Sequence, residues 1–532
     1  MEQEYKQLFV GGDLSGIQKF LYNITSRHAS ISLKGRSAFL SKYLRGVCVK
    51  IEDTILGCNG TFEELYCSGG KFYLITDNTP TITAAINDCA NLCRKELWEN
   101  HRGQLGLNVS YIAYKEENGK FYIEGHDDEQ NTNSGVLWKY VNADFARQKN
   151  QKFKELLLDN YNQFFEVLPV GGKPLVCALT GIESDECIPL DDDIDDEEDV
   201  GAVFLPSVVE QIKAGKKLSI QQGLLNNNRR VKTFSDYAEG SYLGILRMDV
   251  DGLGKRFIIG FDTIKKYKEF SAKVKDFFEG RIGDSPEYKK KDKLLDELDS
   301  ETGLPYRYFL NVIYAGGDDL FIIGRWDKLI NFAELIHIKT EDYFQNNAYW
   351  DDTIDDNGKA VRVVHRITIS GGIAIVKPKY PIDKAAEMAR EAEDAAKQGK
   401  KNAFNMFGKT ISWGNEFDKV KRYKNDFVYY LQDSRLSKSI LHKLMLYASI
   451  AEQNKNRKKR GEPEYFSYIW HISYYLTRYI NRYKTNKDVC DFCRKLRDKD
   501  LDYKDVRSLE LIAIAARWAE LLLKMKEKDN NN

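Results

Sequence analysis

Short apolar runs alternate with stretches of helical periodicity in the second half of the chain. The run LGILRMDV, residues 243–250, has the length and the continuous apolar character of a buried strand. It is followed by apolar residues at helical spacing, with Gly280 expected to end the helix. The apolar residues on this helix face are Ile264, Tyr267, Val274, Phe277 and Phe278.

The segment that follows predicts a hairpin and then one more strand and helix. YFLNVIYAGGDDLFIIGRW, residues 308–326, consists of two apolar runs joined by a Gly- and Asp-rich turn. HRITISGGIAIV (365–376) is expected to be a strand, and the Ala-rich stretch 382–398 a closely packed helix. The order βαββαβ is that of a ferredoxin-like palm domain.

The same order occurs near the N-terminus, and the two copies can be aligned by eye. GGDLSGIQKF (11–20) aligns with RMDVDGLGKR (247–256), which places Asp13 on Asp249 and Gly16 on Gly252. Likewise YCSGGKFYLI (66–75) aligns with YAGGDDLFII (314–323). The sequence therefore predicts an α+β protein with two ferredoxin-like palm domains related by internal duplication.

Three polar segments are expected to be connections between elements. They are acidic residues 191–200, residues 350–362 and basic residues 453–465. Apolar residues at helical spacing fill the C-terminal part. We expect a first palm at 1–135, an inter-palm helical region at 136–238, a second palm at 239–415 and an all-helical domain at 416–532.

Composition narrows the class of protein. The 532 residues contain 80 Lys and Arg and 80 Asp and Glu, so the net charge is zero and gives no evidence for nucleic-acid binding. No apolar run approaches the ~20 residues that span a bilayer, and the N-terminus lacks the pattern of a signal peptide. Nine cysteines without a regular framework indicate a reducing compartment, so we expect a cytoplasmic protein without a membrane partner.

Three acids carry the candidate chemistry. A palm places the end of its first strand beside the turn of its hairpin, which brings Asp249 next to Asp318 and Asp319. Converging carboxylates repel one another unless a cation compensates them. We therefore expect Mg²⁺ (or Mn²⁺) at Asp249, Val250, Asp318 and Asp319, acting on the α-phosphate of a nucleotide. The alternative is that GGDD is only a polar hairpin turn.

Further positions are assigned to nucleotide binding. Gly252, Gly316 and Gly317 allow the backbone to approach phosphates closely. Lys397 and Lys401, four residues apart on an expected helix, could hold a triphosphate or could lie on a solvated face. The first copy has Gly70 and Lys71 in place of Asp318 and Asp319, which favours an acceptor-binding role for that copy.

These motifs resemble the large polymerase–cyclase subunit of type III CRISPR effector complexes, in a subtype A-like form without the nuclease domain. FVGGDLSGIQKFLYNI, SLKGRSAFLSKYL and YCSGGKFYLIT resemble the first palm of that family, and LGILRMDVDGLGKRF, YAGGDDLFIIG, ISGGIAIV and AAKQGKKN the second. The second palm is also similar to diguanylate cyclases.

The resemblance implies synthesis of cyclic oligoadenylate messengers from ATP when the complex binds target RNA. Other effector subunits, guide RNA and target RNA would be the partners, and the C-terminal helices would stack beside small helical subunits. The basic residues Lys455 to Arg460 would touch RNA or form a solvated loop. The partner nucleotide would lie against Ser15, Gly16, Ser68, Gly69 and Gly70.

Two departures from the family pattern change the expected activities. The chain begins directly at the first palm, and its only His-Asp pair, His126-Asp127, is interpreted as surface, so cleavage of single-stranded DNA is not expected. Only Cys177 and Cys187 remain of a four-cysteine zinc module, and structural zinc needs four ligands. Zinc is therefore not expected, and Cys490 with Cys493 and Cys89 with Cys93 are interpreted as ordinary buried thiols.

The sequence leaves three rival functions open. The acids specify attack on an α-phosphate but not the acceptor, so AMP could be joined to S-adenosylmethionine instead of forming adenylate rings. A scaffold that binds guide RNA would not need three converging acids. A stand-alone diguanylate cyclase would not need a duplicated palm or a helical extension.

Overall fold

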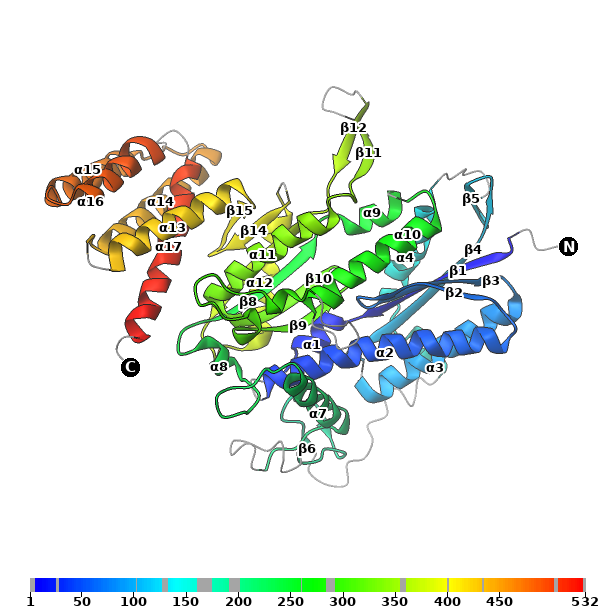
Figure 1. Cartoon of the computed structure of the whole chain (residues 1–532). Helices are drawn as coiled ribbons and strands as arrows, with labels where there is room; N and C mark the ends of the chain where they lie inside the picture. The colour runs from blue at the N-terminus through cyan, green and yellow to red at the C-terminus, as the bar shows by residue number, and fades with distance from the viewer. Residues whose placement is uncertain are drawn as a thin grey trace. The chain divides into compact units, whose positions relative to one another are not determined.

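The computed structural model describes residues 5–24, 28–101, 103–126, 133–159, 175–190, 201–259, 261–283, 292–354, 360–399, 401–432, 435–501 and 506–529 (Figure 1). The chain divides into two compact units. The first comprises Met1–Ile369 and Ile375–Arg390, and the second Ser370–Ala374 and Glu391–Asn532. None of the helices in the described part is both long and apolar enough to cross a membrane.

A five-stranded antiparallel sheet forms the N-terminal part of the first unit. Its order is β2-β3-β1-β4-β5. The strands are β1 (Gln7–Ser15), β2 (Phe62–Ser68), β3 (Lys71–Asp77), β4 (Gly106–Glu117) and β5 (Lys120–Ile123). Helices α1 (Ile17–Tyr22) and α2 (Ala29–Gly57) connect β1 to β2, α3 (Pro80–His101) connects β3 to β4, and α4 (Gly135–Lys149) follows β5.

Alternation along β1 explains why both faces of this sheet are covered. Successive strand residues point to opposite faces. Leu8 and Val10 join the core formed with α2 and α3, whereas Phe9 packs edge-on against Trp138 of α4, with ring centroids 4.6 Å apart. Trp138 in turn stacks on Tyr267, which ties α4 to the second half of the unit.

Three further strands of the first unit have the order β8-β10-β9. They are β8 (Leu243–Val250), β9 (Leu310–Gly316) and β10 (Asp319–Arg325), each within a predicted strand run. Helices α9 (Leu253–Ile259) and α10 (Ile264–Lys275) follow β8. The helix does not end at Gly280 as expected, because a π-helical turn over Asp276–Ile282 continues it. Phe277 and Phe278 remain buried there, and their packing outweighs the low helix propensity of glycine.

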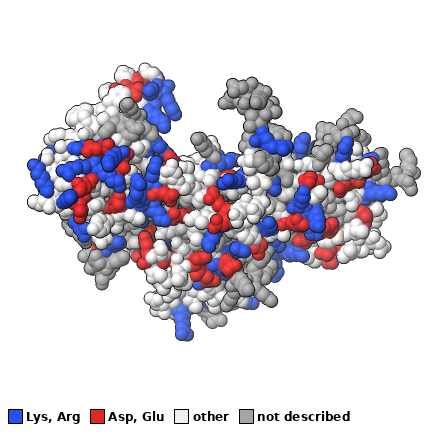
Figure 2. Space-filling model, turned by 45° about the horizontal axis from the view of Figure 1, so that its top comes forward, with Lys and Arg blue, Asp and Glu red and all other residues white. Residues whose placement is uncertain are grey.

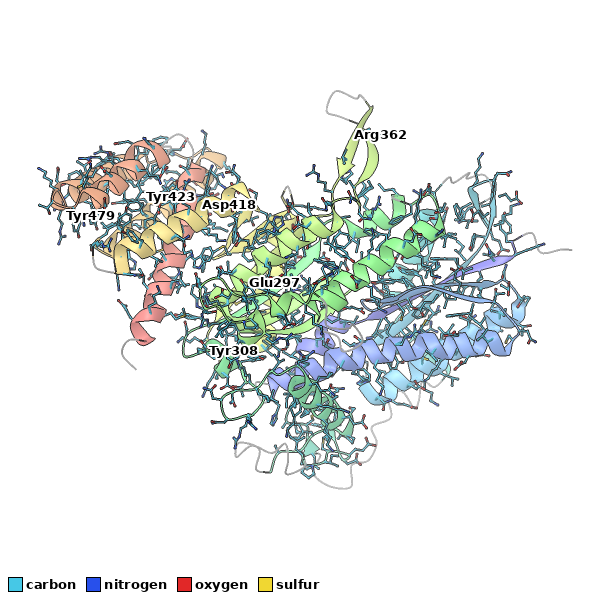
Figure 3. The ribbon with its side chains drawn as sticks, in the orientation of Figure 1. Glu297, Tyr308, Arg362, Asp418, Tyr423 and Tyr479 are labelled. Atoms are coloured by element: carbon cyan, nitrogen blue, oxygen red, sulfur yellow. The ribbon has the colours of Figure 1, made fainter. Side chains whose placement is uncertain are left out.

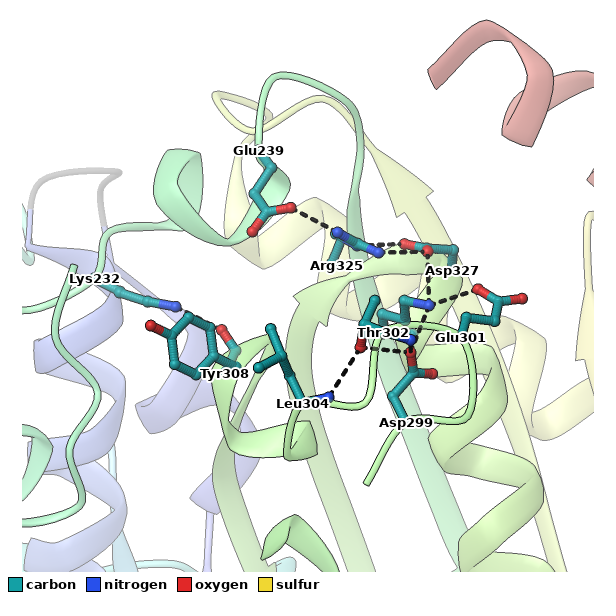
Figure 4. Close-up of polar contacts among 10 residues, drawn as sticks. Lys232, Glu239, Asp299, Glu301, Thr302, Leu304, Tyr308, Arg325 and Asp327 are labelled. Carbon is teal, nitrogen blue, oxygen red and sulfur yellow. Dashed lines mark hydrogen bonds and ion pairs between the residues drawn. The ribbon is translucent and has the colours of Figure 1, made fainter. Parts of the chain in front are cut away.

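A buried ionic network fixes the start of α11 (Trp326–Phe344), which follows β10 (Figure 4). The Nζ atom of Lys328, 1% exposed, lies 2.8 Å from the carboxylate of Asp299, which is fully buried. Arg325 pairs with Asp327 at 2.9 Å and with Glu239 at 2.6 Å. The short 3₁₀ helices at Leu294–Asp296 and Tyr306–Tyr308 flank the Asp299 loop.

Residues 350–362 were expected to be a polar connection, and this expectation is wrong. Strands β11 (Tyr349–Ile354) and β12 (Ala360–His365) pair antiparallel, with Tyr349 opposite His365. The sequence of β12, AVRVVH, is rich in β-branched residues. Cross-strand pairing therefore outweighs the polarity on which the expectation rested.

The part of the first unit that was expected to lie between two palms contains both helices and short strands. It contains α5 (Lys154–Asp159), the short strands β6 (Leu175–Val176) and β7 (Glu183–Ser184), α7 (Pro206–Gln221) and α8 (Phe234–Ala238). Helix α7 packs directly on α2. The two backbones are so close that a Cβ at Gly35 would lie only 1.8 Å from the carbonyl oxygen of Gln211. The acidic segment 191–200 lies outside the described residues.

The second unit combines short strands with a helical C-terminal part. Strand β13 (Ile369–Val376), whose central residues belong to this unit, pairs parallel with β14 (Ala403–Met406), and β15 (Lys409–Ser412) follows. Helix α12 covers Ile382–Lys397, of which the residues from Glu391 onward belong to this unit. The remaining helices are α13 (Asn415–Gln432), α14 (Ser439–Lys459), α15 (Ser467–Arg482), α16 (Lys487–Lys495) and α17 (Val506–Asp529), with a π-helical turn at Leu496–Asp500.

The helical character of the C-terminal part is confirmed, but one boundary is wrong. Residues 453–465 were expected to separate two helices, whereas α14 runs through Lys459 and α15 begins at Ser467. Lys and Arg are good helix formers, so the basic run continues the helix as far as Lys459. Basic and acidic side chains are interspersed on the face drawn in Figure 2, in keeping with a net charge of zero.

Candidate active site

The predicted acids meet at one edge of the β8-β10-β9 strands. Antiparallel pairing places Leu320 opposite Met248, so Asp319 at the start of β10 lies beside Asp249 near the end of β8. Carboxylate oxygens of Asp249 and Asp319 lie within 4.8 Å of each other. Asp318 occupies the turn between β9 and β10. The predicted proximity of the first strand end and the hairpin turn is therefore confirmed.

Electrostatics at this edge show the cost of assembling the acids. Burial raises the pKa of Asp318 to about 6, and the negative charge of Asp319 adds to the increase. A side-chain hydrogen bond with Asp249 and the positive charge of Lys71 act in the opposite direction. Lys71 belongs to the first sheet, so its side chain supplies a cation to the acids of the other sheet.

The hairpin turn between β2 and β3 packs directly against the acid-bearing turn. A Cβ at Gly69 would lie 2.8 Å from the Cα of Gly317, and both glycines have positive φ, +58° and +65°. The Oγ of Ser68 accepts a hydrogen bond from the Gly317 amide at 3.1 Å and donates one to the carboxylate of Glu279. Neither turn could carry a side chain at this contact without moving the other.

Two tyrosines, Tyr66 and Tyr314, lie beside this contact between the turns. A Cβ at Gly317 would lie 3.2 Å from the hydroxyl of Tyr66. Burial and the charge of Asp318 hold the pKa of Tyr66 above the ordinary tyrosine value, and burial with the charges of Asp319 and Asp318 does the same for Tyr314. Both phenols are thus neutral hydrogen-bonding groups. The sequence interpretation used these tyrosines only to align the copies and missed Glu279, whose contact with Ser68 spans 211 residues of sequence.

Ser15 and Gly16 lie next to the same turn of the first sheet. The Leu14 amide donates to the carbonyl of Gly70 at 2.7 Å, while the Ser15 hydroxyl donates to the carbonyl of Gly106 at 3.1 Å. Gly16, at φ +88°, ends β1 against Gln104. These positions thus adjoin Gly69 and Gly70, and their predicted role in nucleotide binding stays a prediction.

The two lysines do not share a helix face as predicted. Helix α12 ends at Lys397, and Lys401 has a left-handed backbone with φ +58°. Gly399 follows the helix, and glycine commonly terminates helices. Lys397 forms an ion pair at 2.6 Å with Glu393, whose side chain is buried. Because its charge is already paired, its predicted contact with a triphosphate would require release from Glu393.

The acids fit a hard divalent cation. All the donor atoms of Asp249, Asp318 and Asp319 are carboxylate oxygens, which Mg²⁺ and Mn²⁺ prefer. Burial, and then the neighbouring charge of Asp319, raise the pKa of Asp318, so a bound cation would stabilise its ionised form. Val250 is buried, and Gly252, with φ +72°, leads the chain from β8 into α9.

Other predicted residues lie in ordinary environments. Cys89, Cys93, Cys490 and Cys493 are buried free thiols, as predicted. Cys177 and Cys187 are also buried free thiols, and the expectation that they hold no zinc stays a prediction. His126 is exposed, whereas Asp127 lies outside the described residues.

The basic run at the end of α14 is partly neutralised. Arg457 and Arg460 pair with Glu462 at 3.5 and 2.8 Å, and Lys458 lies 3.9 Å from Glu464. These acids lower the local positive charge, which weakens the expectation that this run contacts RNA phosphate.

Sequence comparison identifies relatives for two separate parts of the chain. Residues 242–405 match the family Cas10/Cmr2, second palm domain, and residues 6–168 match Csm1 subunit domain B. A curated relative from Methanocaldococcus jannaschii is 23% identical, covering 78% of this chain and 60% of its own length. One from Enterococcus italicus is 25% identical, covering 79% and 57%. Both are named CRISPR system single-strand-specific deoxyribonuclease Cas10/Csm1 (subtype III-A).

Solved structures share the mixed α+β fold. The Csm1-Csm4 cassette in complex with cA4 superimposes with a TM-score of 0.62 at 19% identity, over 98% of this chain and 69% of that chain. The same cassette in complex with one ATP gives a TM-score of 0.63 at 18% identity, over 96% and 70%. This chain spans about 60% of the length of the first curated relative. From its matches to the second palm domain and to domain B, together with these relatives, the chain belongs to the Cas10/Csm1 family.

Proposed function

We propose that this chain is a nucleotidyltransferase that makes cyclic oligoadenylates from ATP within a type III-A CRISPR effector complex. The observation that carries the proposal is the meeting of Asp249, Asp318 and Asp319 at one sheet edge. Solved relatives with the same fold are described as complexes with ATP, pppApA, cA3 and cA4, which are the substrate, an intermediate length and two ring products of such a reaction. Csm4, their partner, is the proposed neighbouring subunit.

The proposal includes an internal duplication. In the first sheet the order β2-β3-β1 places the first strand of the copy next to its hairpin, and β9-β10-β8 repeats that order. In each copy the first strand pairs antiparallel with the second strand of the hairpin. The hairpin turns of the two copies then meet at Gly69 and Gly317. Such a pair of related domains supports the proposed boundaries of the first and second palms.

The two sides of this contact would have different tasks. The second copy presents the acids and would hold the triphosphate of the activated ATP. The first copy carries Gly70 and Lys71 at the corresponding positions and would hold the nucleotide whose 3′-hydroxyl attacks. Lys71, near enough to Asp318 to lower its pKa, would balance part of the added negative charge.

The chemical step would be an in-line substitution at phosphorus. The 3′-oxygen forms a bond to the α-phosphorus, the bond to the bridging oxygen of pyrophosphate breaks, and the hydroxyl proton passes to solvent. Divalent ions held by Asp249, Asp318 and Asp319 would lower the pKa of the hydroxyl and neutralise the leaving group. The protein would contribute mainly orientation, because the packing of Gly69 against Gly317 fixes the two turns relative to each other.

The decisive experiment compares two pairs of neighbouring acids in the assembled, RNA-bound complex supplied with labelled ATP. Asp318→Ala with Asp319→Ala should abolish product while leaving complex assembly intact. Glu52→Ala with Asp53→Ala, a matched adjacent pair on α2, should leave synthesis unchanged. Full synthesis by the Asp318/Asp319 variant would refute the assignment and would favour a scaffold role.

The acceptor is tested in the same assay. Products formed with and without S-adenosylmethionine are resolved by mass. If an AMP conjugate forms and adenylate rings do not, the acceptor is S-adenosylmethionine and the proposed cyclic product is wrong. The curated relatives are named as deoxyribonucleases. Our expectation that this chain does not cleave single-stranded DNA is tested by incubating it with labelled DNA and Mn²⁺.

A further inference from the structure

Helix α10 and the π-helical turn that continues it lie along two sheet edges of the first unit. Among the described strands, β2 is outermost in the first sheet and β9 is outermost in the order β8-β10-β9. The Nζ of Lys268 pairs with Glu63 of β2 at 2.8 Å. A Cβ at Gly283, directly after the π-helical turn, would lie 3.1 Å from the Cβ of Ala315 in β9. One continuous helical segment therefore contacts both hairpins whose turns meet at the candidate site.

The π-helical turn brings a carboxylate to this site. The turn spans Asp276–Ile282 and buries both Phe277 and Phe278. Such turns are uncommon within helices and occur mostly at functional sites. Glu279 lies in the middle of the turn, and the hydroxyl of Ser68 donates a hydrogen bond to its carboxylate. A rare helical geometry thus places an acid beside the turn of the first sheet.

Ser68 links this carboxylate to the acid-bearing turn. Ser68 is buried, and its Oγ also accepts the 3.1 Å hydrogen bond from the Gly317 amide. A hydroxyl has a single proton, so donation of that proton to Glu279 leaves the lone pairs of Oγ for the Gly317 amide. Gly317 directly precedes Asp318 in the chain. Two hydrogen bonds in series therefore join Glu279 to the turn that carries Asp318.

Two phenols enclose these hydrogen bonds. Burial is the main reason that the pKa values of Tyr66 and Tyr314 lie above the ordinary tyrosine value, and the charge of Glu279 contributes to the increase in both. The carboxylate therefore lies near both rings. A side-chain hydrogen bond between Tyr66 and Ser68 acts in the opposite direction on the pKa of Tyr66. A rotation of the Ser68 hydroxyl would break at least one of these contacts.

We infer that Glu279 is a positioning residue for the proposed nucleotidyl transfer. It orients the Ser68 hydroxyl, which in turn fixes the amide of Gly317 and with it the position of Asp318. The inference rests on the proposed function, because its effect is measured in that reaction. The role requires a hydrogen-bond acceptor at position 279 but no negative charge. Glutamine keeps such an acceptor and should keep the role, whereas leucine, of similar size, should lose it.

The experiment measures synthesis from labelled ATP by the assembled, RNA-bound complex. Glu279→Leu should lower kcat by about tenfold and change the KM for ATP by less than about twofold, while Glu279→Gln should keep kcat within about twofold of the original chain. Two controls remove a carboxylate elsewhere. Glu63→Leu breaks the exposed ion pair between β2 and α10, and Glu297→Leu removes an exposed partner of Lys339 that Figure 3 labels. Both should leave kcat unchanged, since exposed ion pairs contribute little.

A double variant tests whether the effect passes through Ser68. Ser68→Ala combined with Glu279→Leu should be no slower than the slower single variant, because both changes interrupt the same series of hydrogen bonds. Two effects that multiply would show that Glu279 acts independently of Ser68 and would overturn the inference. Glu279→Ala, which also lacks the acceptor, replaces Glu279→Leu if that variant does not assemble into the complex.

The outcomes separate this inference from the proposed function. If the complex with the original chain makes no nucleotide product, the proposed function is wrong and the positioning role falls with it. If that complex is active and Glu279→Leu is equally fast, only the positioning role is wrong. A Glu279→Gln variant as slow as Glu279→Leu would mean that the reaction needs the charge or the proton affinity of the carboxylate, which would also overturn the positioning role.

Discussion

The hydroxyl of Ser68 connects the turns of two sheets, which makes it a sensitive residue for testing the site. The sequence interpretation assigned it to nucleotide binding, but its hydrogen bonds go to Gly317 and Glu279. A residue held in this way positions the acid-bearing turn. Its effect on catalysis should then differ from that of a residue that contacts ATP.

We predict that Ser68→Ala lowers kcat by roughly tenfold or more while changing the KM for ATP little, because small shifts in catalytic groups slow the chemical step. The free energy of unfolding should fall by about 1–2 kcal/mol, since the Gly317 amide loses its acceptor. Steady-state kinetics of the assembled complex measure the first effect and thermal unfolding the second. Ser41→Ala, an exposed hydroxyl on α2, serves as the control. An increase in KM with kcat unchanged would restore the nucleotide-binding assignment.

The raised pKa of Asp318 predicts how stability depends on pH when no divalent ion is present. Its pKa is about 6 in the folded chain and near 3.8 in the unfolded chain, so the folded state binds more protons between these values. Stability is therefore greatest below about pH 4 and decreases as pH rises through 6, by at most about 3 kcal/mol.

Asp318→Asn should consequently raise the melting temperature at pH 7.5 and leave it nearly unchanged at pH 4. Mg²⁺ should stabilise the original chain at pH 7.5 but not at pH 4, because protonation competes with the metal. Differential scanning calorimetry at both pH values measures these effects. Equal melting temperatures at pH 7.5 without metal would show that Asp318 is not destabilised by its neighbours.

Helix α11 offers a comparison between a buried and an exposed ion pair. Lys328 pairs with the fully buried Asp299, whereas Lys339 pairs at 3.4 Å with Glu297 and both partners are largely exposed. Lys328→Met should cost about 3–5 kcal/mol, because it leaves a buried carboxylate without its cation. Lys339→Gln should cost at most about 1 kcal/mol. Urea unfolding gives both values, and similar costs would contradict the role of the network in Figure 4.

Elements with strong local signals were predictable. The eight residues of β8, the GGDD hairpin and the Ala-rich helix α12 are each encoded by periodicity and turn residues within a short window. The β11–β12 hairpin, the continuation through Gly280 and the extension of α14 were not predicted. In each case a polar residue or a glycine suggested an end, and pairing or packing with other segments decided otherwise.

For the whole molecule, the balance of 80 basic and 80 acidic residues predicts a solubility minimum near pH 7. Without net charge, molecules do not repel one another over long distances. Precipitation by polyethylene glycol between pH 5.5 and 9 measures this, and the amount needed should be lowest near neutrality. A minimum displaced by two pH units would mean that the folded chain reaches zero net charge at a pH far from the one that its composition predicts.

The sequence alone predicted which acids come together and that a strand end and a hairpin turn hold them, since both depend on neighbouring residues. It also provided the resemblance to the family. Only the tertiary structure showed that the turn at Gly69 closes against Gly317 and that Glu279 holds Ser68. Contacts over such separations depend on how the sheets and helices pack, and no short stretch of sequence records that packing.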